Sequence, residues 1–111
     1  MRAFDLLSIL KEIQIYGTHN AEVSAVTSDS RAIIKDALFV AVRGVQTDGH
    51  AFIENAIAEG AATIVCENLP EKLSDSVLYA QVKNSAEALG LLSAQFYDNP
   101  SEKFTLIGVT G

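Results

Sequence analysis

Two polar stretches of the sequence combine hydroxyl, amide and small side chains in a way that suits nucleotide binding. The first covers residues 27–31 and reads Thr-Ser-Asp-Ser-Arg, and the second covers residues 44–50 and reads Gly-Val-Gln-Thr-Asp-Gly-His. Both stretches offer hydroxyls, amides and backbone N–H groups with few formal positive charges. Such groups can hydrogen-bond a uracil or a sugar, and the amino end of a helix after the second stretch can receive a diphosphate.

Each stretch also has a purely structural interpretation that the residues alone leave open. Residues 28–30 are of types that close a turn through hydrogen bonds from side chain to backbone. Residues 48–50 are typical of a helix cap, supplied by Asp48, and the first turn that follows it. Because the amino end of a helix disfavours an imidazolium ion, we interpret His50 as a neutral histidine and not as a catalytic base.

The sequence predicts no catalytic centre and no metal site. Its carboxylates are scattered over segments that we expect to be exposed, and no Ser/His/Asp set or pair of acids can be defended. Cys66 lies inside an apolar run, where a packing role is expected instead of a nucleophilic one. As the single cysteine, it cannot form an internal disulfide, and no Cys/His spacing indicates structural zinc.

The composition restricts the class of protein further. With 111 residues, 49% of them hydrophobic and 20% charged, the chain has the size and composition of one globular domain. Its 8 basic and 14 acidic residues give a formal net charge of -6 without a cationic cluster, so we expect no nucleic-acid partner. No apolar run is long enough to span a membrane, and the amphipathic N-terminus lacks a cleavage site. We therefore expect a cytoplasmic monomer with no membrane contact.

Strands and helices alternate in the expected elements that position the two stretches. Small and β-branched residues predict a short strand over residues 22–28 that runs into a turn, and apolar runs of strand length predict strands over residues 37–42, 62–66, 77–82 and 104–109. Helical spacing of apolar residues predicts helices over residues 4–13, 52–60 and 84–98. The alternation predicts an α/β fold, a small Rossmann-like three-layer domain with a mainly parallel sheet built from βαβ units.

This fold brings the two polar stretches together. Ligands of open α/β sheets bind outside the carboxyl ends of the parallel strands. Residues 27–31 end the first expected strand, and residues 44–50 follow the second. At the start of the last helix, Asn84 stands three residues before Glu87, a spacing that resembles a capping box.

A series of short motifs resembles the amino-terminal domain of the Mur ligases. No single motif is specific, but the order and spacing of the set are, and the similarity runs from about residue 23 to the last residue. One departure is Asp36-Ala37, where the family usually has Gly-Asp, so the turn must accept Asp, which tolerates unusual φ better than most residues. The motifs are Asp29-Ser30-Arg31, Leu38-Phe39-Val40-Ala41, Gly44, Asp48-Gly49-His50, Ala56-Ile57, Gly60-Ala61-Ala62 and Leu106-Ile107-Gly108-Val109-Thr110-Gly111.

The resemblance implies a division of labour along a longer protein. In the family, the amino-terminal domain holds the UDP part of the substrate, the central domain binds ATP, and the carboxyl-terminal domain supplies the incoming amino acid. Residues 1–98 would be the UDP-substrate-binding domain, and residues 99–111 a linker and the first strand of the central domain. Gly111 would begin the ATP loop, whose lysine and magnesium-binding hydroxyl are absent from this sequence. ATP and magnesium would serve the full-length enzyme, and we expect neither bound to this chain.

The resemblance also assigns contacts residue by residue. It places uridine contacts at Ser28 and Ser30, with the Ser30 hydroxyl as the side chain that binds and Ser28 acting through its backbone. Further nucleotide contacts fall at Val45, Gln46 and Thr47. The neighbours of Ser30, at positions 29 and 31, are expected to fix the turn.

Within the family, Ser30 and Val109 favour one branch. This branch adds a diamino acid, meso-diaminopimelate or L-lysine, to the small-molecule substrate UDP-N-acetylmuramoyl-L-alanyl-D-glutamate in peptidoglycan precursor synthesis. The alternatives are the branch that adds the following dipeptide, and a stand-alone nucleotide-binding module without a ligase attached. The central and carboxyl-terminal domains of the same protein are the other partners that the resemblance implies.

Overall fold

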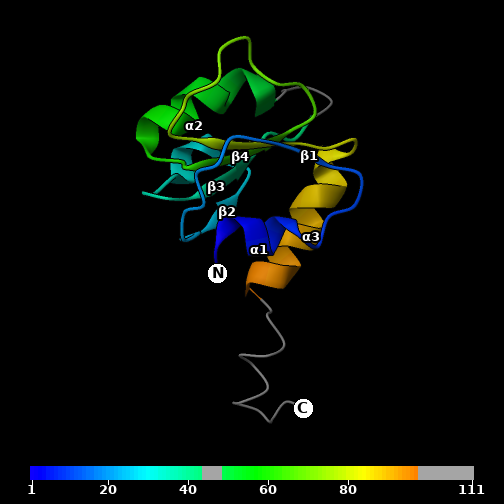
Figure 1. Cartoon of the computed structure of the whole chain (residues 1–111). Helices are drawn as coiled ribbons and strands as arrows, with labels where there is room; N and C mark the ends of the chain where they lie inside the picture. Colours follow the sequence, from blue (N-terminus) through cyan, green and yellow to red (C-terminus); the bar gives the residue numbers. More distant parts are fainter. Residues whose placement is uncertain (44–48, 98–111) are drawn as a thin grey trace.

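A five-stranded sheet forms the central layer of the domain (Figure 1). The structure is a computed structural model, and it describes residues 1–43 and 49–97. β2, β3, β4 and β5 pair with one another in parallel, while β1 pairs with β5 in the antiparallel sense, so the prediction of a mainly parallel sheet is confirmed. In the order of the sheet, the strands are β1 (Gln14–Tyr16), β5 (Leu78–Gln81), β4 (Thr63–Cys66), β3 (Leu38–Val40) and β2 (Val26–Thr27).

Helices cover both faces of this sheet, which gives the expected three layers. α2 (Ile53–Glu59) lies on one face, and α1 (Ala3–Leu7) and α3 (Ser85–Tyr97) lie on the other (Figure 1). Two short 3-10 helices, η1 (Ser30–Ala32) and η2 (Gly49–Phe52), complete the described elements. α2 connects β3 to β4 as a βαβ unit, whereas η1 lies between β2 and β3 and a helix-free loop joins β4 to β5. The α/β fold class is therefore confirmed.

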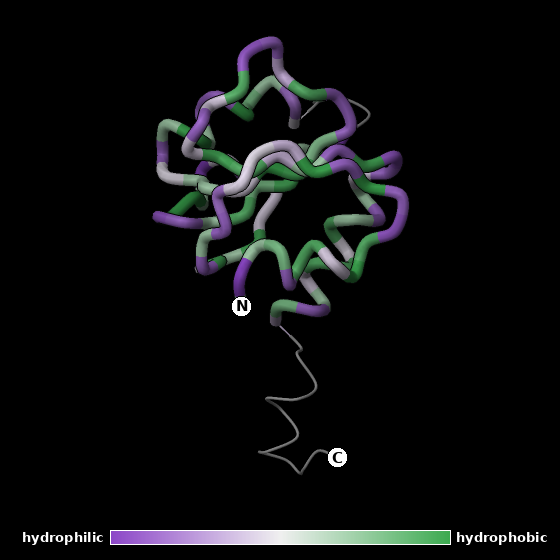
Figure 2. Tube along the Cα trace, viewed as in Figure 1, coloured by the Kyte–Doolittle hydropathy of each residue, from purple (hydrophilic) through white to green (hydrophobic). Residues whose placement is uncertain are grey.

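The continuous apolar runs explain why the central strands are buried on both faces. A strand that is covered above and below needs an apolar side chain at every position. In β3, the side chains of Leu38 and Val40 belong to the apolar cluster beneath α1 and α3, while Phe39 belongs to the cluster beneath α2. All three are fully buried. Figure 2 shows the same distribution, with hydrophobic segments in the central strands and hydrophilic ones in the outer loops.

The amino-terminal helix is shorter than predicted. Spacing predicted a helix over residues 4–13, but α1 ends at Leu7 and the chain continues into β1. Phe4, expected on the buried side, is 39% exposed. Leu10 and Ile13 still pack against the core, but from a non-helical segment that contains Glu12 at a φ of 54°. The apolar residues of this segment thus reach the core from a short helix and a bend, because the pairing of β1 with β5 outweighs local helix preference.

Several local predictions are confirmed at named residues. Asp36 has a φ of 66°, so aspartate does accept the left-handed turn where the family usually has glycine. The N–H of Glu87 donates to Oδ1 of Asn84 over 3.0 Å, which caps α3. The helix break at residues 99–100 and the strand over residues 104–109 lie outside the described residues, as does the cap expected at Asp48.

The outer edge of β2 is covered by a side chain from the last turn of α3. The hydroxyl of Tyr97 accepts a hydrogen bond from the N–H of Val26 over 2.9 Å and donates to its carbonyl over 3.1 Å. The flanking carbonyl of Ala25 accepts from the N–H of Leu38 on β3, so these Val26 groups face away from the sheet. Tyr97 thereby ties α3 to the edge of the sheet.

Candidate functional site

The carboxyl ends of the parallel strands meet at one edge of the sheet, and a cleft opens there between the ends of β2 and β3. Its volume is about 550 Å³. One wall is the turn after β2, and the other comes from the segment after β3 and from η2. The cleft is lined by Ser28, Asp29, Ser30, Arg31, Val42, Gly49 and Phe52. The structure therefore brings Ser28 and Ser30 into one cavity, at the edge where ligands of such sheets bind.

Asp29 and Arg31 fix the turn that forms the first wall. Oδ1 of Asp29 accepts hydrogen bonds from the backbone N–H of Arg31 over 2.8 Å and from its Nε over 3.1 Å. The N–H of Asp29 donates to Oγ1 of Thr27 over 3.0 Å. The hydrogen bonds with Arg31 hold the pKa of Asp29 below its ordinary value. The expectation that these two residues fix the turn is confirmed.

The two serines beside them remain available to a ligand. Ser28 is exposed and Ser30 is half-buried. Across residues 1–43 and 49–97, neither hydroxyl has a hydrogen-bond partner, although both residues line the cleft. The turn therefore satisfies its own backbone through Asp29 and presents the serine hydroxyls unbonded.

Phe52 forms an apolar surface across the cleft that sequence reasoning missed. Helical spacing placed it with Ile53 on the buried side of a helix, but Phe52 lies at the end of η2 and is 39% exposed. A 3-10 helix has three residues per turn, so side chains that follow it are rotated from the face that an α-helical count predicts. An exposed aromatic ring in a polar cleft offers a surface on which a nucleobase stacks.

Gly49 closes the second wall by a backbone contact that excludes a side chain. A Cβ on Gly49 would lie 2.8 Å from the nitrogen and 3.0 Å from the carbonyl oxygen of Val42. The N–H of Gly49 donates to the same carbonyl over 2.8 Å. The chain thus returns to the end of β3 at residue 49. The predicted contacts Val45, Gln46 and Thr47 lie outside the described residues, as does Gly111.

A hydrogen-bonded network that the sequence did not predict lies beside the cleft. Oε2 of Glu67, directly after β4, accepts from the N–H of Ser85 over 2.9 Å and from its hydroxyl over 2.8 Å. The Ser85 oxygen accepts from the N–H of Arg43 over 3.1 Å. Nε2 of His50 accepts from the N–H groups of Glu67 and Asn68 over 2.9 and 3.1 Å. The only sequence signal was the position of Glu67 at the carboxyl end of a buried strand.

The electrostatics of these groups follow from their contacts. The two hydrogen bonds from Ser85, with a further contribution from the charge of Arg43, lower the pKa of Glu67 from its ordinary value. Nε2 of His50 acts here as a hydrogen-bond acceptor for two backbone N–H groups. Burial raises the pKa of Cys66 to about 11, so this thiol has the expected packing role and is not an activated nucleophile.

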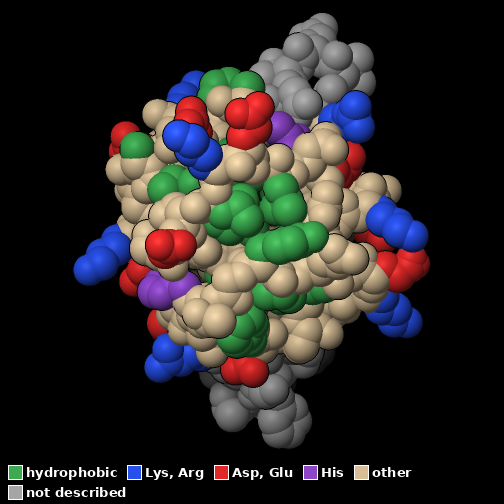
Figure 3. Space-filling model, turned by 45° about the horizontal axis from the view of Figure 1, so that its top comes forward, with side chains coloured by type: hydrophobic (Ala, Val, Ile, Leu, Met, Phe, Trp, Pro, Cys, Tyr) green, Lys and Arg blue, Asp and Glu red, His purple; other side chains and the backbone are tan. Residues whose placement is uncertain are grey.

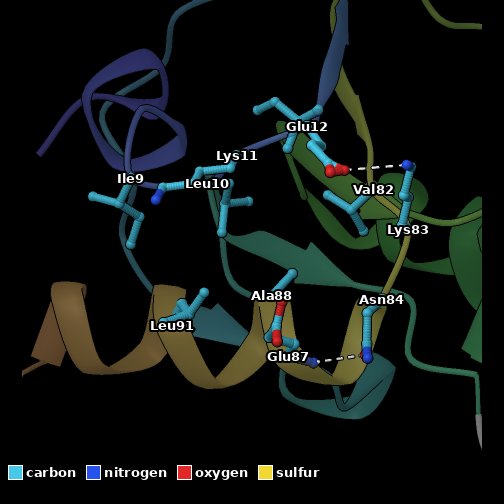
Figure 4. A pocket seen from close by; sticks show the side chains of 11 residues that line it. Ile9, Leu10, Lys11, Glu12, Val82, Lys83, Asn84, Glu87, Ala88 and Leu91 are labelled. Carbon is cyan, nitrogen blue, oxygen red and sulfur yellow. Dashed lines mark hydrogen bonds and ion pairs between the residues drawn. The ribbon is translucent and has the colours of Figure 1, made fainter.

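A second groove lies between residues 9–13 and the first turns of α3 (Figure 4). Its volume is about 430 Å³, and Leu10, Ala88 and Leu91 contribute apolar surface. Two of its charged groups form an ion pair, with Nζ of Lys83 3.1 Å from Oε1 of Glu12. The cleft at Ser28 and Ser30 lies between the carboxyl ends of two parallel strands, where ligands of such sheets bind, so it is the better candidate for a nucleotide.

The charged side chains of one face and the potential metal ligands among the described residues add no further candidate. Figure 3 shows acidic and basic side chains interspersed around the visible face, without a cationic cluster. Among residues 1–43 and 49–97, no group of three or more His, Cys, Asp or Glu could hold a metal ion. In the same part of the chain, no helix is both long and apolar enough to cross a membrane.

Comparisons with known proteins identify relatives of this chain. The family model "Mur ligase family, catalytic domain" matches residues 22–97. A UDP-N-acetylmuramoyl-L-alanyl-D-glutamate--2,6-diaminopimelate ligase from Parabacteroides distasonis is 46% identical over 111 residues, which is 100% of this chain and 23% of that protein. A ligase of the same name from Chlorobaculum tepidum is 53% identical over 91 residues, 82% of this chain and 18% of that protein. The chain therefore spans less than a quarter of the length of these relatives.

Solved structures agree with the family. The MurF ligase from Thermotoga maritima, in complex with ADP, is 31% identical, with a TM-score of 0.56 over 68% of this chain and 17% of that one. A MurF structure from Acinetobacter baumannii, 23% identical over 74% of this chain and 17% of that one, shares the fold with a TM-score of 0.61. Since the family model covers most of the described residues and the fold agrees, the chain belongs to the Mur ligase family.

Proposed function

We propose that this chain is the domain that anchors UDP in a ligase that adds a diamino acid to UDP-N-acetylmuramoyl-L-alanyl-D-glutamate. The observation that carries this proposal is the cleft at the carboxyl edge of the sheet, lined by Ser28 and Ser30, whose hydroxyls have no hydrogen-bond partner among residues 1–43 and 49–97. The identity of 46% to a ligase of that name supports this branch over the one that adds the following dipeptide. The names of the relatives favour diaminopimelate over L-lysine as the diamino acid.

The cleft has the chemistry that a uridine requires. The Ser30 hydroxyl donates or accepts a hydrogen bond with the uracil or ribose, and Ser28 contributes through its backbone. The ring of Phe52 provides a stacking surface for the base. Val45, Gln46 and Thr47 supply the further nucleotide contacts from the segment that ends at Gly49. Residues 1–98 form this binding domain, and residues 99–111 lead into the central domain.

Anchoring UDP assists chemistry that takes place elsewhere in the full-length enzyme. ATP with magnesium, held by the central domain, supplies the phosphoryl group that activates the D-glutamate carboxylate for attack by the amine. This chain holds the far end of the same substrate, so the carboxylate arrives oriented, and remote binding energy lowers the barrier. The enzyme acts in the cytoplasm as a monomer, with the other domains of the same protein as partners of this one.

Calorimetric titration of the chain with the UDP-linked dipeptide, with UDP and with ATP tests the proposal. We expect both UDP compounds to bind and ATP not to bind. Ser30→Ala should raise the Kd for UDP about five- to tenfold, since a neutral hydrogen bond contributes about 1 kcal/mol. In the full-length enzyme the same change should raise KM for the UDP substrate with a smaller effect on kcat.

Ser93→Ala on α3 is the matched control, because Ser93 does not line the cleft. This control should bind UDP as the unsubstituted chain does. Absence of UDP binding at millimolar concentration would contradict the proposal, and so would an unchanged Kd for Ser30→Ala.

A further inference from the structure

The side of α3 that faces away from the sheet is almost free of charge. Positions spaced by three or four residues share one face of a helix. Of the six exposed residues on this face, only Glu87 is charged. An exposed helix face ordinarily carries charged and polar side chains, as α2 does at Glu54 and Glu59. The six exposed residues are Ala86, Glu87, Gly90, Leu91, Ala94 and Tyr97.

This face continues into the groove between residues 9–13 and the first turns of α3. Leu91, which is 46% exposed, lines the groove together with Ala88 and Leu10. Figure 4 shows Ala88 and Leu91 on the helix, with Ile9 and Leu10 across the groove from them. Contiguous apolar surface that is open to solvent marks an interaction site more often than a single exposed apolar residue does. The outward face of α3 and the groove thus form one apolar surface.

The described residues give Gly90, in the middle of α3, no conformational or packing reason to be glycine. It is not one of the glycines with a positive φ, and a Cβ added to it would meet nothing within 4 Å outside the backbone of its own helix. Glycine inside a helix is less favourable than alanine. A glycine does let another backbone approach closely. The open space over Gly90 therefore suits an element from outside this domain.

A neighbouring domain of the same protein is available to cover this surface. The chain spans less than a quarter of the length of the relatives that it matches. α3 ends at Tyr97, and in the proposed function the residues beyond it lead into the central domain. A domain tethered through a short linker is held at a local concentration of the millimolar order. A surface of moderate area is therefore enough for docking, as is usual between the domains of one chain.

We propose that the outward face of α3 and the adjoining groove form a docking surface for the domain that follows in the full-length ligase. This inference rests on the proposed function only in that the chain is one domain of a longer ligase. Lys11 and Glu87 flank the groove, and neither forms an ion pair with the described residues. The matching surface of the following domain is therefore apolar, with an acidic group for Lys11 and a basic group for Glu87.

Hydroxyl-radical footprinting of the full-length ligase, read by mass spectrometry, tests the docking surface. Leu73, between β4 and β5, is the matched reference, because it is 42% exposed in this domain and Leu91 is 46% exposed. Each oxidation rate is divided by the rate of the same residue in urea-unfolded protein. We expect Leu91 to react about fivefold more slowly than Leu73, since docking for about 80% of the time leaves the surface open for about a fifth of it.

Gly90→Gln tests whether close approach at this position is required. The space over Gly90 is open within this domain and Gly90 does not line the groove, so the change leaves the fold and the groove intact. In the full-length ligase the added side chain should prevent docking and raise the rates of Leu91 and Leu10 several-fold. Ala58→Gln is the matched control, because Ala58 is exposed on α2, and it should change neither rate.

Equal rates for Leu91 and Leu73 in the full-length ligase would overturn the inference, and so would unchanged rates in Gly90→Gln. Protection of Leu91 that appears only at high protein concentration would indicate a second copy as the occupant and would overturn it as well. UDP binding to the same protein separates this inference from the proposed function. If UDP binds while Leu91 stays open, the inference alone fails. If Leu91 is protected and UDP does not bind, the proposed function of the cleft fails.

Discussion

At the scale of single residues, Thr63 is a buried hydroxyl without a partner. Its side chain is fully buried at the start of β4, and within the described part of the chain its Oγ1 accepts and donates no hydrogen bond. A hydroxyl that leaves water without gaining a partner costs about 1 to 3 kcal/mol. Thr63 therefore contributes less to stability than an apolar side chain of the same shape would.

We expect Thr63→Val to raise the free energy of unfolding by about 1 kcal/mol, because a methyl group replaces the unsatisfied hydroxyl in the same volume. Urea denaturation measures this directly. Thr63→Ser is the control, since it keeps the hydroxyl and removes a buried methyl group, and it should lower the free energy of unfolding. A Val variant less stable than the unsubstituted chain would show that the hydroxyl is satisfied after all.

At the scale of elements, Glu67 joins the end of β4 to the first turn of α3. The contribution of this connection to stability depends on pH. Its hydrogen bonds with Ser85 lower the pKa of Glu67 in the folded chain below the value of an unfolded glutamate. A lowered folded pKa means that the contribution is present above about pH 4.5 and disappears as the pH falls through the folded pKa.

The free energy of unfolding should therefore fall less steeply in Glu67→Gln than in the unsubstituted chain as the pH is lowered from about 5 to about 3. Urea unfolding at a series of pH values gives both curves. Glu59→Gln provides the comparison for loss of one exposed carboxylate and should follow the unsubstituted chain. Parallel curves for Glu67→Gln and the unsubstituted chain would contradict this linkage.

Elements with one dominant signal could be predicted from the sequence. Residues 37–42, 62–66 and 77–82 are mostly apolar runs of strand length, the pattern that strands covered on both faces show. Residues 4–13 have spacing that fits a helix, but the actual short helix and bend depend on pairing with β5, a contact remote in sequence. Local patterns cannot report such pairing, so the error falls at the amino-terminal edge of the sheet.

The candidate site likewise has features that the sequence predicts and features that it does not. The turn at Asp29 and Arg31 was predictable because the contacts span two residues and depend on side-chain type. The bond between Glu67 and Ser85 joins residues 18 apart, and its partners meet only after the sheet has formed. Phe52 was missed because a 3-10 turn shifts its direction. The sequence thus predicted the cleft wall whose contacts join residues close in sequence. It missed the contacts of the opposite wall, which join residues remote in sequence.

At the scale of the whole molecule, the reactivity of the Cys66 thiol measures whether the domain is folded. It is fully buried in β4, between two parallel neighbours, and burial raises its pKa to about 11. A thiol reagent therefore needs the sheet to open before it can react. Since β4 lies in the middle of the sheet, we expect that opening to be global unfolding.

Reaction of Cys66 with a chromogenic disulfide reagent near neutral pH should be negligible in buffer and should rise along urea with the same midpoint as the loss of far-UV circular dichroism. Bound UDP substrate should move both midpoints upward together. Rapid reaction in buffer, with the circular dichroism unchanged, would show a local opening at β4 instead.

The tie between Tyr97 and Val26 also bears on how the molecule behaves at high concentration. An exposed sheet edge offers free N–H and carbonyl groups to a strand of another molecule, which leads to aggregation. At the edge formed by β2, the outward groups of Val26 are already bonded to the phenol of Tyr97. A second chain would have to break both bonds and displace α3 before it could add a strand. The two bonds of Tyr97 therefore oppose the addition of a strand from another molecule at this edge.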